Sequence, residues 1–186
     1  MAVVSAHDVA REIRARDRGA GVLKVQKLLY YCQGWHLALN GEPLFAEEIE
    51  AWTNGPVVAD LWHDEAKGRP QRATGLLNER QLAIIAFVCG KYRCCSGREL
   101  IETTHSEPPW RDAIATSAEP NPGITIDAMR EFFAGQIDPV ASALLDDRRC
   151  HDELRARQAE AIARIDTTPP SVDPVDWFDS QLSRLR

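Results

Sequence analysis

Apolar residues recur at helical spacing along most of the chain, and this periodicity predicts a mainly α-helical fold. The clearest case is residues 23–39, where aliphatic side chains follow one stripe and aromatic side chains cover the other faces. A helix that is apolar on all sides is normally surrounded by the rest of its fold. Asn40-Gly41 follows directly, and glycine provides the left-handed residue that ends many helices. Residues 23–39 are therefore predicted to form the central helix.

Further helix starts are predicted from capping boxes, in which an N-cap residue and a residue three positions later bond each other's backbone N–H groups. The pairs that fit this pattern are Ser5 with Asp8, Asn78 with Gln81, and Ser96 with Glu99. In the helix predicted from residue 79 to 92, the face expected to be buried consists of Leu82, Ile85, Ala86 and Cys89. Two short helices are expected at residues 110–115 and 125–133.

One extended segment interrupts the helices at residues 43–52. Apolar residues at positions 44–45 and 49–52 flank an acidic pair at 47–48. This alternation predicts a short β-hairpin with the acidic pair near its turn.

Asn54-Gly55 is predicted to form a turn, because both residues tolerate the backbone angles that turns require. Pro56 then fits the first position of the next helix, where its missing N–H has no intrahelical partner in any case. That helix is expected to bury Leu61 and Trp62.

Beyond residue 137 the pattern changes. A single apolar stripe predicts a long helix with charged outer faces, and a Pro-rich linker leads to an amphipathic end. The apolar face of that end consists of Trp177, Phe178, Leu182 and Leu185. The expected organisation is a compact helical domain with one small β-hairpin, residues 1–137, followed by a C-terminal helical extension, residues 138–186.

Composition narrows the functional classes. Among the 186 residues, 44% are hydrophobic and 27% are charged, as in an ordinary globular protein. The net charge of −6 argues against nucleic-acid binding, which needs a basic face. No apolar run approaches the ~20 residues of a membrane-spanning helix, and the first residues lack a signal-peptide pattern. We therefore expect a cytoplasmic protein without a membrane partner.

Five cysteines without a C-x-x-C pair are typical of reduced, mostly buried thiols. The alternative is a zinc site built from Cys89, Cys94, Cys95 and His105. Zinc ligands are usually paired two to four residues apart, whereas Cys94 and Cys95 are adjacent. We therefore expect no metal and no other cofactor.

The tetrapeptide from Thr104 to Glu107 offers a nucleophile, a base and a carboxylate. Catalytic triads converge from different elements, so sequence neighbours seldom form one. We expect a structural corner instead, in which Ser106 or Glu107 ends one helix and starts the next while His105 hydrogen-bonds across the junction. His36 is expected to be a packed core histidine.

Three sequence blocks resemble the Panacea domain of SocA-like antitoxins, which occurs in bacterial and phage toxin–antitoxin pairs. In order, they are Lys27 to Leu37 (KLLYYCQGWHL), Pro43 to Val57 (PLFAEEIEAWTNGPV) and Leu100 to Trp110 (LIETTHSEPPW). The resemblance covers about residues 5–134. The motif residues for which it implies a structural role are Trp35, His36, Trp52, Gly55, Pro56, Val57, His105 and Trp110.

The resemblance implies an antitoxin of bacterial or prophage origin that neutralises a co-encoded toxin by direct binding, and not an enzyme. It also allows a role as a proteolytic adaptor that delivers the toxin to a protease. Because antitoxins often neutralise through variable extensions, the hypothetical toxin-binding residues are Trp177, Phe178, Leu182 and Leu185, which could equally dock on the protein's own core. A homodimer stays open. The alternative function is a metal-dependent hydrolase that uses His105 and the nearby cysteines.

Overall fold

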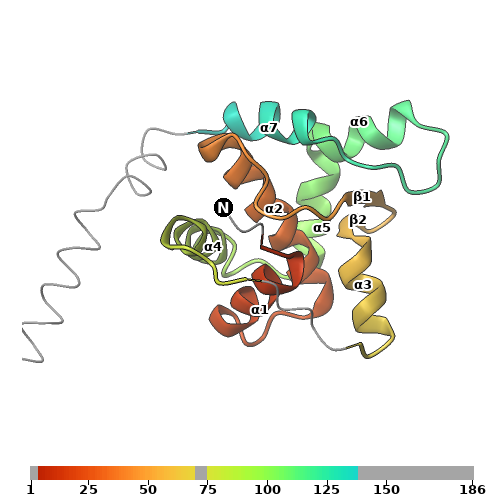
Figure 1. Ribbon diagram of the computed structural model, residues 1–186. Helices are drawn as coiled ribbons and strands as arrows, with labels where there is room; N and C mark the ends of the chain where they lie inside the picture. The colour runs from red at the N-terminus through yellow and green to blue at the C-terminus, as the bar shows by residue number, and fades with distance from the viewer. Residues whose placement is uncertain (1–3, 70–74, 138–186) are drawn as a thin grey trace, which may run out of the picture. The chain divides into compact units, whose positions relative to one another are not determined.

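The computed structural model describes residues 4–69 and 75–137, and this part of the chain is mainly α-helical, as predicted (Figure 1). Its helices are α1 (Ala6–Arg16), α2 (Val22–Asn40), α3 (Ala59–Ala66), α4 (Glu79–Lys91), α5 (Gly97–Ser106), α6 (Pro108–Thr116) and α7 (Ile126–Ala134). Its strands are β1 (Ile49–Trp52) and β2 (Gly55–Val58). The predicted C-terminal extension lies outside the described residues. No described helix has the length and apolar character needed to cross a membrane.

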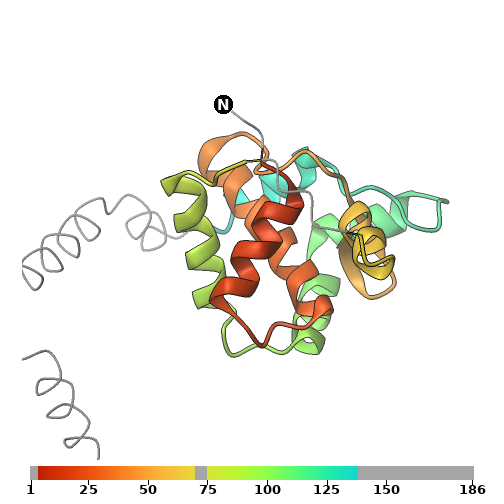
Figure 2. The same cartoon turned by 60° about the horizontal axis from the view of Figure 1, so that its bottom comes forward.

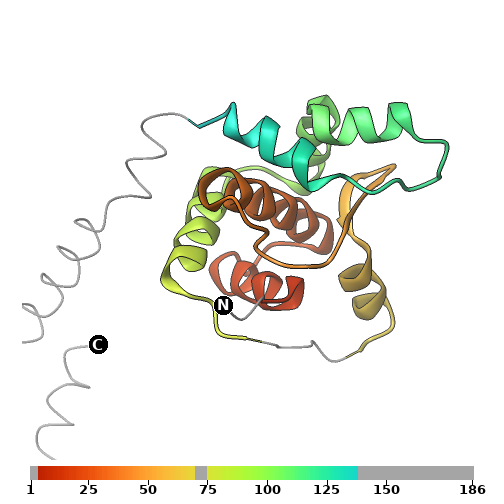
Figure 3. The ribbon, with the colours of Figure 1, turned by 45° about the horizontal axis from the view of Figure 1, so that its top comes forward.

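Helix α2 is the centre of the fold, as its sequence predicts. All of its residues from Val25 to Leu37 are buried, and α1, α4, α5, α7 and β2 all contact it. Helices α1 and α4 lie side by side against it (Figure 2), while α7 packs on the side away from α1 (Figure 3). Gly41 ends the helix with a left-handed φ of 76°.

The three predicted capping boxes are confirmed at the starts of α1, α4 and α5. The predicted buried face of α4 is only partly right. Ile85 is buried, but its buried neighbours are Ile84 and Val88, and the remaining three expected residues are half-buried: Leu82, Ala86 and Cys89. Two overlapping apolar stripes run along this helix, and its contacts with α1 and α2 decide which stripe faces the core.

The β-hairpin exists, but with a different partner strand from the predicted one. β1 pairs antiparallel with β2, from Ile49 opposite Val58 to Trp52 opposite Gly55. Pro56 therefore lies in a strand, and the helix that was expected to start there begins at Ala59. Gly55 has a left-handed φ of 86°, as in hairpins whose turn is followed by a left-handed glycine. The two β-branched residues after Pro56 favour the extended strand.

The expected first strand, at residues 44–45, is held by a side chain of α2 instead. Gln33 Oε1 accepts hydrogen bonds from the backbone N–H groups of Leu44 (2.8 Å) and Phe45 (3.2 Å). Its Nε2 donates to the carbonyl oxygen of Phe45 at 3.0 Å. Because Gln33 satisfies these backbone groups, residues 44–45 do not need a full neighbouring strand, and Phe45 forms an isolated parallel bridge with Val4.

Both edges of the hairpin have hydrogen-bond partners. On the β1 side, Ile124 N donates to Ile49 O (2.7 Å) and Ala51 N donates to Pro122 O (2.8 Å). On the β2 side, Gln26 Oε1 accepts from Val58 N at 2.8 Å. These contacts fix the hairpin against α2 and against the segment before α7.

Candidate functional site

The three motif blocks meet at Gly55. Lys27 of α2 is fully buried, and its Nζ donates a hydrogen bond to the carbonyl oxygen of Pro56 at 2.8 Å. A Cβ atom on Gly55 would lie 2.8 Å from both Lys27 Cε and Thr104 Oγ1. Side chains from α2 and α5 therefore meet at Gly55 of β2, and each block contributes one of these residues.

Burial changes the electrostatics of Lys27. Removal of the ammonium group from water lowers the pKa of Lys27 to about 7. In the described part of the chain no carboxylate offsets this effect. Both the charged and the neutral amine of Lys27 keep an N–H that can donate to the carbonyl oxygen of Pro56. Lys27 therefore acts as a buried hydrogen-bond donor that fastens β2 to α2.

His105 of α5 and Trp110 of α6 pack beside the hairpin that contains Gly55. Their rings stack with centroids 4.0 Å apart, and Trp110 Nε1 donates to the carbonyl oxygen of Trp52 at 3.0 Å. The His105 ring also lies near the backbone of Thr53 in the hairpin turn. Burial, followed by the nearby charge of Lys27, lowers the pKa of His105, whereas the Thr53 backbone acts to raise it. The imidazole thus links the hairpin to the α5–α6 corner.

The corner itself is formed by Glu107, which ends α5 and starts α6, as expected. Its Oε1 accepts a hydrogen bond from the Tyr31 hydroxyl at 3.0 Å. Burial raises the pKa of Glu107, and the Tyr30 and Tyr31 hydroxyls act in the opposite direction. Tyr31 also stacks on Tyr92, with centroids 4.1 Å apart. The paired tyrosines and the glutamate of the motif therefore join α2 to α5 and α6.

The remaining motif residues occupy other parts of the fold. Trp35 is 2% exposed and packs against the rings of Phe87 and Phe133. His36 is buried, with Nδ1 2.7 Å from the carbonyl oxygen of Glu42. Val57 is buried in β2. The hypothetical toxin-binding residues lie outside the described part of the chain: Trp177, Phe178, Leu182 and Leu185.

The outer side of the hairpin carries an aromatic surface that the sequence pattern did not reveal. We define it by five residues from four elements (β1, α3, α5 and α6), none of them fully buried: Trp52, Trp62, His63, His105 and Trp110. The Trp52 and Trp62 rings meet edge to face, with centroids 5.9 Å apart. Leu61 and Trp62 were both expected in the core, but of these two residues only Leu61 is buried. The hairpin register turns Trp52 towards α3, and this pairing has no signal in the sequence.

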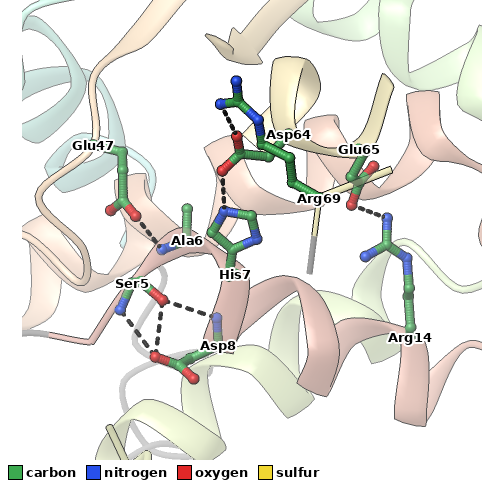
Figure 4. A network of polar contacts seen from close by, with 9 residues as sticks. All are labelled: Ser5, Ala6, His7, Asp8, Arg14, Glu47, Asp64, Glu65 and Arg69. Atoms are coloured by element: carbon green, nitrogen blue, oxygen red, sulfur yellow. Dashed lines mark hydrogen bonds and ion pairs between the residues drawn. The ribbon is translucent and has the colours of Figure 1, made fainter. Parts of the chain in front are cut away.

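A polar network holds α3, which carries Trp62 and His63, against α1 (Figure 4). His7 Nε2 lies 3.3 Å from Asp64 Oδ2, and Arg14 donates to Glu65 at 2.6 Å. Both Asp64 and His7 are buried. Because buried polar groups are costly to leave unpaired, this network gives α3 a defined position beside the hairpin.

The residues of the alternative zinc site do not assemble. Within residues 4–69 and 75–137, no three His, Cys, Asp or Glu side chains are placed to hold a metal ion. Cys94 is exposed, whereas Cys89 and Cys95 are half-buried. Burial raises the pKa of the Cys89 thiol to about 11, which disfavours the thiolate form that binds metal.

Comparison with known proteins adds one finding. Residues 25–111 match the family model described as "Antitoxin SocA-like, Panacea domain". No curated protein and no solved structure matches the chain. The matched segment runs from α2 to the first part of α6, so it includes Lys27, the hairpin, His105 and the whole aromatic surface. It is narrower than the range of about 5–134 suggested by the sequence blocks. Residues 25–111 of this chain are therefore similar to the SocA-like Panacea domain.

Proposed function

We propose that this protein is an antitoxin that neutralises a co-encoded protein toxin by direct binding in the cytoplasm. The match of residues 25–111 to the SocA-like antitoxin domain carries this proposal. Neutralisation by binding also implies that the protein acts without catalysing a reaction.

Charged motif residues are engaged in contacts within the fold, and this supports binding over catalysis. Lys27 is fully buried and bonded to Pro56, and Glu107 accepts a bond from Tyr31. Catalytic groups have to reach a substrate in suitable geometry. These two charged motif residues are instead engaged in holding helices and strands together, so the motif describes a scaffold.

We propose that the domain spans residues 1–137 and that residues 138–186 form an extension. α7 follows the matched segment, yet its Phe133 is buried among Tyr30, Tyr31 and Trp35 of α2. A helix packed this way belongs to the same core. The extension is proposed to contribute toxin contacts through its terminal apolar residues: Trp177, Phe178, Leu182 and Leu185.

Co-expression tests the function. The product of the neighbouring gene is produced alone or with the full chain, and growth is measured together with the affinity of the purified pair. We expect toxicity from that product alone, rescue by the full chain and formation of a stable complex. A neighbouring product that is harmless, or that does not bind, would overturn the proposal.

Removal of residues 171–186 tests the extension separately. We expect this variant to keep the melting transition of residues 1–137 but to bind the toxin at least tenfold more weakly, or ~1.4 kcal/mol. Unchanged affinity and full growth rescue would place recognition on the domain. The adaptor role that the family allows would add a protease as a second partner, and a shorter toxin half-life in cells that contain this protein would support it.

A further inference from the structure

We propose that the aromatic surface is where the domain docks its toxin, and that it receives a basic segment rich in Lys or Arg. This inference rests on the proposed antitoxin function and deepens it by naming the surface and the chemistry of its partner. The surface is the one defined above, formed around the hairpin by Trp52, Trp62, His63, His105 and Trp110.

The partial exposure of two tryptophans is the first reason. Four tryptophans lie in the described part of the chain, and only Trp35 is buried in the core. Trp52 and Trp62 are neither in the core nor packed against it, and they contact each other at the surface. Tryptophan is strongly enriched among the residues that dominate the energy of protein interfaces. Two indoles paired outside the core therefore indicate a binding surface.

The indoles are also held in place before any partner arrives. Glu50 and Trp52 share the outer face of β1, because residues two positions apart in a strand point the same way. Trp52 Nε1 donates to Glu50 Oε2 at 2.7 Å, and Trp110 Nε1 donates to the Trp52 carbonyl. Figure 4 shows the polar contacts that anchor α3, the helix that carries Trp62. Such preorganisation reduces the ordering cost of association.

The charge around this surface selects a basic partner. Residues 41–66 contain seven Asp and Glu residues and no Lys or Arg, and Lys67 follows at the end of α3. Asp64 and Glu65 are paired with arginines from elsewhere, whereas Asp60 of α3 is exposed and Glu50 lies beside Trp52. On the α6 side, Arg111 is paired with Asp112. Lys and Arg side chains can lie over indole faces while the nearby carboxylates neutralise their charge.

Other occupants fit this surface less well. A second copy of the chain would bring an equally acidic surface against it, and like charges disfavour that contact. Nucleic acid and anionic membranes would be repelled for the same reason. A basic protein segment complements both the aromatic side chains and the acidic charge of this surface.

Titration calorimetry of the full chain with the purified product of the neighbouring gene tests the proposal. Trp62→Ala should weaken binding at least tenfold, and Glu50→Gln should weaken it at low salt by a factor that shrinks as salt is added. Gln keeps the hydrogen-bond acceptor for Trp52 while removing the charge. Leu76→Ala is the matched control, because Leu76 is 96% exposed and precedes α4. We expect its affinity to equal that of the unaltered chain.

The outcomes separate the two proposals. If the unaltered chain neither binds nor rescues growth, the antitoxin function fails and this inference fails with it. If the unaltered chain binds and Trp62→Ala binds equally well, the aromatic surface is wrong while the function stands. Loss of binding in Trp62→Ala without any salt-dependent effect of Glu50→Gln would overturn the basic character of the partner. His63→Ala, which changes an exposed side chain, repeats the test if Trp62→Ala does not fold.

Discussion

Gly34 of α2 lies directly beneath the ring of Phe133 of α7, and a Cβ atom at Gly34 would overlap that ring. Phe133 is 2% exposed and also meets the rings of Tyr30 and Trp35. The absent side chain thus makes room for an aromatic residue about a hundred positions later in the chain. This contact joins the Panacea segment to a helix that follows it.

Gly34→Ala should therefore destabilise the protein. Overpacking of a filled core costs ~1–3 kcal/mol, although alanine is favoured over glycine inside a helix by ~1 kcal/mol. Gly90→Ala in α4 is the control, because a Cβ atom there meets nothing within 4 Å, and it should be neutral or stabilising. Chemical denaturation measures both variants. A double variant that also carries Phe133→Ala should show positive coupling, and simple additivity would mean that the two residues are not in conflict.

Gly55 and Gly41 share a left-handed φ, of 86° and 76°, but have different surroundings. At Gly41 nothing lies within 4 Å of an added Cβ, whereas at Gly55 the Lys27 and Thr104 side chains do. Gly41→Ala should cost ~1–2 kcal/mol through backbone strain alone. Gly55→Ala should cost ~1–3 kcal/mol more because it also crowds Lys27, and Gly55→Val should be worse still. Equal losses in thermal or chemical unfolding would show that the motif glycine serves only the turn.

Lys27 should make stability depend on pH. Its folded pKa of about 7 lies below the ordinary value of 10.5, so between these values the unfolded chain binds more protons. The contribution of Lys27 to the free energy of unfolding therefore rises with pH from about 7 towards 10.5, with a slope of up to ~1.4 kcal/mol per pH unit. Below pH 7 this contribution is constant. Lys27→Met should remove this slope.

The comparison between Lys27→Met and the unaltered chain is needed because other groups act in the opposite direction. Burial raises the pKa values of Tyr30 and Cys89, so their folded forms keep protons that the unfolded chain loses, and stability falls at high pH. These residues are present in both proteins and cancel in the difference between the two pH curves. A difference that does not change between pH 7 and 10 would show that Lys27 keeps an ordinary pKa.

The three motif tryptophans should differ in their contribution to stability. Trp35→Ala should cost ~3–5 kcal/mol because it empties the centre of the core. Trp110 is half-buried against the core, so Trp110→Ala should cost less. Trp52→Ala should have the smallest effect, since Trp52 packs outside the core. Thermal melts provide this ranking, and an equally large loss for Trp52 would assign it to the fold and weaken its role in binding.

The sequence alone predicted the helix starts and ends that are set by residues within the same turn. Ser5, Asn78 and Ser96 start helices because their side chains accept backbone hydrogen bonds within the same turn. Gly41 ends α2 because glycine tolerates the left-handed region. The aromatic coverage of α2 likewise predicted its burial. None of these features needs a distant partner.

The hairpin and the aromatic surface were decided by distant contacts. Residues 44–45 and the valines at 57–58 can both form a strand, and the strand next to β1 was settled by Gln33 occupying the backbone of the first segment. Gln26 and Lys27 on the same helix hold the second segment instead. A one-dimensional pattern shows which residues favour an extended chain, but it does not show which backbone groups a side chain from another helix will satisfy. For the same reason the pairing of Trp52 with Trp62 exists only once the hairpin is placed against α3.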